Sequence, residues 1–490
     1  MTSTDAPGTV PGAAPDIATA PPSLSRGDRT VIGVLLVATF VVILNETIMG
    51  VALPVLLTEL DVTAAVGQWL TAGFLLTMSV VIPITGYLIQ RVRTRVLYGV
   101  AMGLFSSGTL IAALAPGFTV LMAARVVQAS GTAIMLPLLM TTVMTLVPPA
   151  RRGALMGNIS IVISVAPAIG PTVSGVVLDL FGWRAMFWSV LPIALATLVL
   201  GLRMVTNIGE SSEAPLDVPS VVLSVFGFGG LVYGLSSIGH ASGSASATLW
   251  ASLAVGVGGI TAFVLRQVSL QRRERALLDL RTFAFRTFTL ASALMMVMMG
   301  LLLGVATILP IYIQNVLGLD PLATGLLLLP GGLLMGLLSP LVGRLYDRVG
   351  PRLLLIIGTV ATSASLWFAA SFDASTPAAL VLVFHLVLSL GLAFSFTPLF
   401  SAGLGALPSR LYSHGSAIFS TTQQLAAAAG VALLVSVMSG RAADLAASGQ
   451  PAVSAEMGGL HTALLFAAVA SLAAVAGSFL VKGGKAESPA

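Results

Sequence analysis

The chain has 490 residues, of which 57% are hydrophobic and only 8% charged, and its mean hydropathy is +1.02. So apolar a composition excludes a water-soluble globular domain of this length and predicts an integral membrane protein. The sequence contains no cysteine, which excludes disulfides and thiolate metal sites, and its formal charge of +5 is spread over short segments between apolar stretches, unlike a nucleic-acid-binding patch.

Residues 1–29 are rich in Ala, Pro, Thr and Ser and predict a disordered cytoplasmic tail, because no basic region precedes an apolar core as in a signal peptide. A helix needs about 20 apolar residues to cross a membrane. On that basis the sequence predicts an all-α polytopic fold of fourteen spans. These are 30–57, 66–89, 96–115, 119–143, 154–178, 185–205, 218–239, 249–267, 289–313, 322–345, 353–371, 378–401, 414–438 and 459–481.

The spans group as six, two and six. We expect an N-terminal bundle at 30–205, a linker with two extra helices and a basic segment at 206–288, a C-terminal bundle at 289–481, and a cytoplasmic tail at 482–490. Leucines within the basic segment are consistent with an interfacial helix on the cytoplasmic leaflet, and a solvated connector is the alternative.

A repeat relates the two bundles. The segments 86–95 and 343–352 read GYLIQRVRTR and GRLYDRVGPR, and each follows the second span of its set. Transporters are commonly built from such repeats, with their binding sites between them.

Arginine and lysine predict the orientation. With alternate loops assigned to opposite sides, 20 of the 23 basic residues fall on the side of the N-terminus. Cytoplasmic loops carry the positive excess, so both termini are expected in the cytoplasm.

Reactive motifs are scarce. The sequence has no phosphate-binding GxxxxGK[ST] loop and no GxSxG nucleophile elbow, and its four histidines are widely separated. We therefore expect no enzymatic activity, metal or cofactor, and an ion gradient as the energy source.

Glu46 follows an apolar run within the first span. Desolvation disfavours the charged carboxylate, so the sequence predicts a proton-binding group whose partner is Arg125 in the fourth span, at similar depth. Two alternatives remain open: Glu46 is a helix-end acid bonded to its neighbours, or Arg125 extends outward to Glu59 or Asp61.

Several motifs occur in order along the chain. The loop pattern GxxxDRxGR[KR] is matched in the second repeat and partly in the first. In the fourth span, ARVVQASG resembles the pattern RxxQGxG, and in the fifth, APAIGPTVSG resembles the pattern GxxxGPxxGG. The chain thus resembles the major facilitator superfamily, specifically its fourteen-span drug:proton antiporters. The motif positions are Gly343, Asp347, Arg348, Gly350 and Arg352; Gly86, Arg91 and Arg95; Arg125, Gln128 and Gly131; and Gly170, Pro171 and Gly175.

The first-span motif departs from the family pattern LDxTxxNxALP. Asn45 occupies the position of the usual acid, Glu46 fills a variable position, and Gly50 replaces an asparagine. Gln90 likewise replaces the loop acid of the first repeat. Adjacent helical residues project about 100° apart, so the acid has moved around its helix.

The resemblance implies an exporter of lipophilic drugs or toxic small molecules in the bacterial cytoplasmic membrane, driven by protons and acting as a monomer within the lipid bilayer, without nucleic acid. It implies proton coupling by Glu46 and Arg125, and gating by the two loop motifs. A proton-coupled uptake symporter and a non-transporting membrane sensor or scaffold are the alternatives. Candidate cavity residues are Asn45, Gln128, Met295, Met299 and His385.

Overall fold

The computed structural model describes residues 24–62, 64–67, 69–207, 217–237, 244–273 and 275–481. Its long apolar segments are helical throughout the described residues, as a hydrocarbon environment requires, because a helix satisfies its own backbone hydrogen bonds. The first of them begins at Arg26, slightly before the expected start of the first span. The C-terminal tail 482–490, most of the N-terminal tail and 208–216 of the linker lie outside the described residues.

The N-terminal set follows the expected order of spans. Its helices are α1 (Arg26–Glu59), the short α2 (Ala64–Gly67), α3 (Trp69–Arg91), α4 (Thr94–Ala113), α5 (Phe118–Leu146), α6 (Arg152–Phe181) and α7 (Trp183–Met204), with a 3-10 turn at Pro149–Arg151 before α6.

The inserted pair comes next. Its first arm consists of α8 (Val218–Ser224), a π-helical turn (Val225–Gly229) and α9 (Gly230–Ser237), and its second arm is α10 (Ser244–Gln271). The arms approach closely through glycine, since a Cβ on Gly230 would lie 2.9 Å from the backbone nitrogen of Gly256.

The C-terminal set follows a 3-10 turn at Leu280–Ala284. Its helices are α11 (Arg286–Ile311, continued by a π-helical turn at Tyr312–Val316), α12 (Pro321–Val349), α13 (Pro351–Ala369), α14 (Ala378–Gly405), α15 (Tyr412–Ala447, after a 3-10 turn at Ser409–Leu411) and α16 (Ala452–Leu480).

Thirteen helical spans within the described residues are long and apolar enough to cross a membrane. The 30-residue α6 is a further helix and is not among the thirteen. The expected count of fourteen and the cytoplasmic location of the termini therefore stay predictions.

Helix pairing is the same in both sets. In the first, α1 packs on α6, α3 on α5, and α4 on α5 and α7. In the second, α11 packs on α15, α12 on α14, and α13 on α14 and α16. This matches the repeat found in the sequence, because each pair in one set corresponds by order to a pair in the other.

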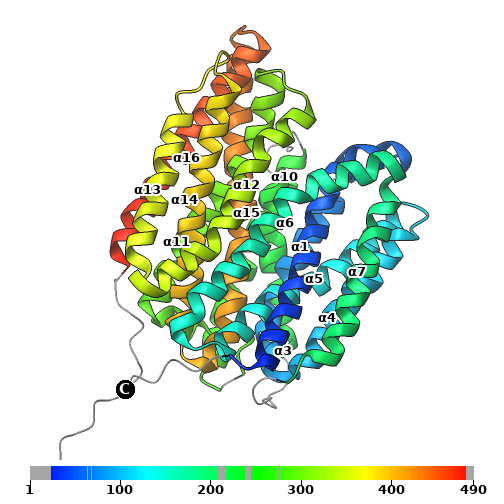
Figure 1. Ribbon diagram of the computed structural model, residues 1–490. Coiled ribbons are helices and arrows are strands. Elements are labelled where there is room, and N and C mark those ends of the chain that lie inside the picture. The colour runs from blue at the N-terminus through cyan, green and yellow to red at the C-terminus, as the bar shows by residue number, and fades with distance from the viewer. Residues whose placement is uncertain are drawn as a thin grey trace, which may run out of the picture.

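The two sets lie side by side and meet along two seams (Figure 1). The second helix of each set packs on the fifth helix of the other, which gives an α3–α15 seam and an α6–α12 seam. The guanidinium of Arg152, at the start of α6, lies 5.3 Å from the ring centre of Tyr412 at the start of α15. We call this end of the bundle, where Arg91, Arg152 and Arg348 lie, the basic end.

Residues 276–279 form neither the interfacial helix nor the solvated connector expected for the basic linker. Residues 276–279 are not helical, and Leu277 and Leu278 are buried inside the protein, at 0% and 3% exposure. Because these leucines find protein partners, they have no apolar face to give to the lipid surface.

Candidate functional site

Arg125 on α5 lies at the centre of a polar network inside the N-terminal set. Its side chain is 1% exposed, and its Nη1 donates to Gln128 Oε1 at 2.7 Å and to Asn45 Oδ1 at 3.4 Å. The guanidinium also lies 4.0 Å from the ring centre of Phe74, a cation–π contact. Gln128 Nε2 in turn donates to Thr109 Oγ1 at 2.8 Å, so the network joins α1, α4 and α5.

The hydrogen-bond partners of Arg125 are neutral. Within the described residues no ion pair joins it to Glu46 or any other acid. A buried cation is costly unless it is paired, so this guanidinium gives the interior a positive charge that an approaching carboxylate would stabilise. Glu46 is adjacent in sequence to Asn45, whose side chain binds Arg125.

The alternative in which Arg125 extends outward is wrong, because its side chain is buried and bonded within the bundle. Glu59 instead accepts a hydrogen bond from Trp183 Nε1 at 2.8 Å.

A small cavity of about 20 Å³ lies between the two sets. Phe396, Phe400 and Met299 give it aromatic and thioether walls, and none of its lining residues is charged. The cavity has room for about one water molecule, and its volume is well below the range for small-molecule sites, about 300–1,000 Å³, so a drug-sized ligand needs a conformation in which the two sets lie further apart here. The lining residues are Ser160, Ile163 and Ser164 of α6, Met299 and Leu302 of α11, Phe396 and Phe400 of α14, and Gln423 of α15.

Polar atoms in the cavity wall are left available. Ser164 Oγ and Gln423 Nε2 are buried and have no hydrogen-bond partner among the described residues. Ser160 Oγ accepts from Thr397 Oγ1 at 3.0 Å across the two sets. Apolar walls with a few convergent polar groups suit an uncharged or amphipathic ligand.

The structure places the candidate cavity residues in different environments. Met299 lines the cavity, whereas Met295 is 0% exposed and absent from its wall. Asn45 and Gln128 belong to the Arg125 network. His385 on α14 packs against α12, where a Cβ on Gly331 would lie 2.2 Å from its ring.

The fifth-span motif lies in α6. A Cβ on Gly170 would lie 2.2 Å from Thr47 Oγ1 of α1, so this glycine permits close contact beside Glu46. A Cβ on Gly175 would have no atom of another helix within 4 Å, so this glycine is not required for close packing. The side chain of Pro171 lies outside the described residues.

The second loop motif closes the α6–α12 seam at the basic end. The Asp347 carboxylate accepts hydrogen bonds from the backbone N–H groups of Gly153, at 2.8 Å, and Ala154, at 2.9 Å. These are orphan donors at the start of α6, where a helix dipole favours negative charge. A Cβ on Gly343 would lie 2.1 Å from the Gly153 carbonyl oxygen, so the two backbones touch here.

The first loop motif closes the α3–α15 seam differently. Gln90, in place of an acid, donates from Nε2 to the Arg410 carbonyl oxygen at 3.1 Å. The Arg91 guanidinium lies 4.9 Å from the ring centre of Tyr87. Gly86 lies in the seam. Arg95, Arg348 and Arg352 are exposed, so the bracing role expected of the motif arginines is not tested by their contacts and stays a prediction.

Most of the cavity wall was not anticipated from the sequence. Ser160 and Ser164 share one face of α6, and Phe396 and Phe400 share one face of α14, by their spacing of four residues. That spacing was the available signal, but in an apolar helix it does not distinguish an inward face from a lipid-facing one.

A family model described as Major Facilitator Superfamily matches residues 35–431. The chain is 42% identical to the Uncharacterized MFS-type transporter YcnB of Bacillus subtilis (strain 168), over 92% of this chain and 94% of that protein. It is 40% identical to the Lincomycin resistance protein LmrB of the same strain, over 91% of this chain and 94% of that protein.

Two solved structures share the fold. The human organic anion transporter MFSD10 aligns with a TM-score of 0.65 and 14% identity, over 94% of this chain and 100% of that chain. The proton:xylose symporter XylE aligns with a TM-score of 0.59 and 16% identity, over 92% of this chain and 97% of that chain.

Proposed function

This chain belongs to the Major Facilitator Superfamily, and from that premise we propose that it is a proton-coupled antiporter that exports lipophilic drugs or other toxic small molecules across the bacterial cytoplasmic membrane. The observation that carries the proposal is the uncharged cavity shared by the two helix sets. Alternating access exposes such a cavity to one side of the membrane at a time. The similarity to a lincomycin resistance protein makes lincomycin the first compound to test.

Proton coupling is assigned to Glu46. The carboxylate form of Glu46 is attracted to the buried charge of Arg125, and the protonated form is not, so protonation changes how α1 and α5 interact. Protonated Glu46 favours one orientation of the cavity, and deprotonated Glu46, balanced by Arg125, favours drug binding.

The test is efflux driven by a pH gradient in membrane vesicles. Glu46→Gln keeps the size of the side chain and removes the titration, so we expect coupled efflux to be lost. The matched control is Asp444→Asn, an exposed acid near the end of α15, which we expect to transport as the parent does. Full pH-driven efflux by Glu46→Gln would show that the coupling assignment is wrong.

A susceptibility panel tests the substrate class. Cells that produce the protein should tolerate more lincomycin or other apolar antibiotics than cells without it, and dye should leave energised cells. Uptake of the dye would identify a symporter instead. No change in susceptibility and no transport would favour the sensor or scaffold alternative.

A further inference from the structure

The segment 276–284, which links the inserted pair to the C-terminal set, is buried over 276–279 and at Thr282, whereas Phe283 and Ala284 are exposed. Leu277 and Thr282 are 0% exposed, and Asp279 is 4% exposed. The carboxylate of Asp279 is neutralised within the segment, where Arg281 Nη2 donates to its Oδ2 at 2.6 Å. This ion pair lets a charged residue enter the protein, and the pKa of Asp279 is lowered by its hydrogen bonds to Arg281 even though burial opposes the shift.

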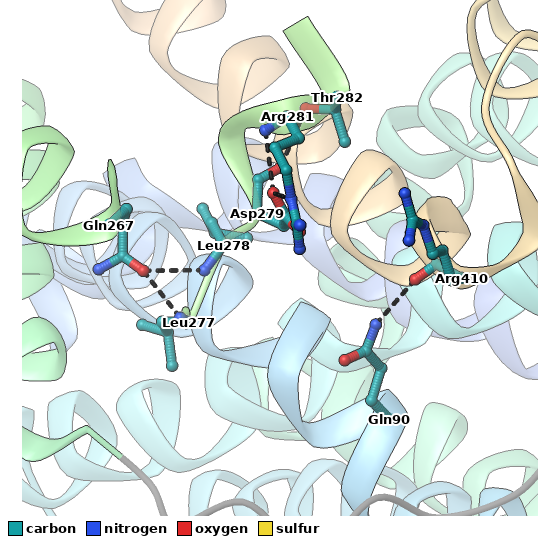
Figure 2. Close-up of polar contacts among 8 residues, drawn as sticks. All are labelled: Gln90, Gln267, Leu277, Leu278, Asp279, Arg281, Thr282 and Arg410. Carbon is teal, nitrogen blue, oxygen red and sulfur yellow. Dashed lines mark hydrogen bonds and ion pairs between the residues drawn. The ribbon is translucent and has the colours of Figure 1, made fainter. Parts of the chain in front are cut away.

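Gln267 on α10 holds this segment by its backbone (Figure 2). Its Oε1 accepts from the N–H groups of Leu277, at 2.7 Å, and Leu278, at 3.2 Å. Its Nε2 donates to Ser220 Oγ on α8 at 2.7 Å. The side chain is fully buried, so a single amide joins both arms of the inserted pair to the segment.

The two arms are also tied to each other beside Gln267. Arg266 donates to both oxygens of Asp217, at 2.7 Å each, in the bidentate geometry that makes such pairs strong. Asp217 caps α8 by accepting from the Ser220 N–H at 3.1 Å. The ion pair therefore fixes the position of Gln267 relative to both arms of the inserted pair.

The other side of the segment contacts both helices of the α3–α15 seam. A Cβ on Gly86 of α3 would lie 3.3 Å from Leu278 Cδ2, 3.0 Å from Ala417 Cβ and 3.3 Å from the Ser413 carbonyl oxygen. Leu278 thus lies where α3 and α15 meet. One turn along α3, Gln90 bonds the backbone of Arg410, as Figure 2 shows.

We propose that residues 276–284 are a plug that holds the α3–α15 seam closed at the basic end, and that the inserted helices serve to anchor this plug through Gln267. The proposal rests on the alternating access of the proposed function, and it assigns a role to the extra helix pair. Opening the basic end separates α3 from α15, so Leu278 cannot remain against both. The plug therefore stabilises the closed seam by the apolar contact that opening would expose.

The experiment measures access to the cavity, not transport. Because the chain has no cysteine, Ser164→Cys supplies a single, nearly isosteric reporter in the cavity wall. Its rate of labelling by a membrane-impermeant maleimide is measured in inside-out and right-side-out vesicles. Gln267→Met keeps the length of the side chain and removes the three hydrogen bonds of the anchor.

The matched control is Gln271→Met, one turn further along α10, because the Oε1 of Gln271 has no hydrogen-bond partner among the described residues. Leu278→Ala removes the wedge and leaves the anchor intact, so it tests the plug separately. Size-exclusion profiles of all variants verify folding before labelling.

We expect Gln267→Met and Leu278→Ala to raise labelling in inside-out vesicles by about 5- to 30-fold, the effect of one or two kcal/mol, and to lower it in right-side-out vesicles. Gln271→Met should match the parent. Unchanged labelling in both variants, or an equal rise from both sides, would overturn the proposal. A one-sided rise in a protein that transports nothing would retain the plug and reject the proposed function.

Discussion

The Asp347 carboxylate joins α12 to the start of α6 through two hydrogen bonds across the seam, and Asp347→Asn tests this contact. The asparagine keeps one acceptor and turns an N–H₂ donor toward a backbone N–H, so one hydrogen bond is lost and the other is no longer charge-assisted. A hydrogen bond to a charged group contributes about 1.5–3 kcal/mol. At 1.4 kcal/mol per tenfold, the closed state should lose roughly 10- to 150-fold of its advantage.

The assay is a distance distribution between spin labels at the basic end. Ala150→Cys and Val349→Cys place labels at two exposed positions on opposite sides of this seam, and no native cysteine competes. If about 1% of the parent is open, a tenfold shift raises the open fraction to about 9%, which appears as a second, longer distance.

The control is Asp320→Asn. Asp320 also caps a helix start, with Oδ1 accepting from the Ala323 N–H at 2.7 Å, but it does so within α12 and not across the seam. It should leave the distribution unchanged. If Asp347→Asn also leaves it unchanged, the carboxylate does not hold the two sets together and the reasoning is refuted.

Three further substitutions test other contacts. Gly343→Ala would place a methyl group 2.1 Å from the Gly153 carbonyl oxygen, so the same spin labels should report an opened seam. Gln128→Leu removes the 2.7 Å acceptor of Arg125, which should cost about 1.5–3 kcal/mol and lower the Tm of the purified protein, and an unchanged Tm would contradict the network. Arg266 lowers the pKa of Asp217 from 3.8 to about 2, so its carboxylate stabilises the fold above about pH 4, and the Tm difference between the parent and Asp217→Asn should close as the pH falls toward 2.

The helices could be predicted because a membrane span needs a long apolar run, and such runs are visible without any partner. The repeat could be predicted as well, since its loop motifs lie outside the spans. The neighbours of each helix could not be predicted. Gly153 and Gly157 are four residues apart on α6, and only the structure shows that they face Gly343 and Ser339 across the two sets.

The candidate site was predicted in part. Arg125 and Gln128 are three residues apart on one helix, a spacing that brings side chains together. Asn45 takes part in their network although it stands where the family has an acid. The burial of Leu277 and Leu278 was missed, because arginines around them resemble a membrane-surface segment and the buried acceptor that holds their backbone comes from a distant helix.

The two seams are held by different contacts, although the repeat relates them. One is held by a carboxylate at a helix start and by touching glycine backbones, and the other by an amide and an inserted segment that the repeat does not supply. Neither Gln267 nor any residue of 276–284 belongs to the cavity wall. On the proposed plug, changes in the insert alter how readily the seam opens and leave the cavity wall as it is, and exchanging residues 206–288 between relatives tests this separation.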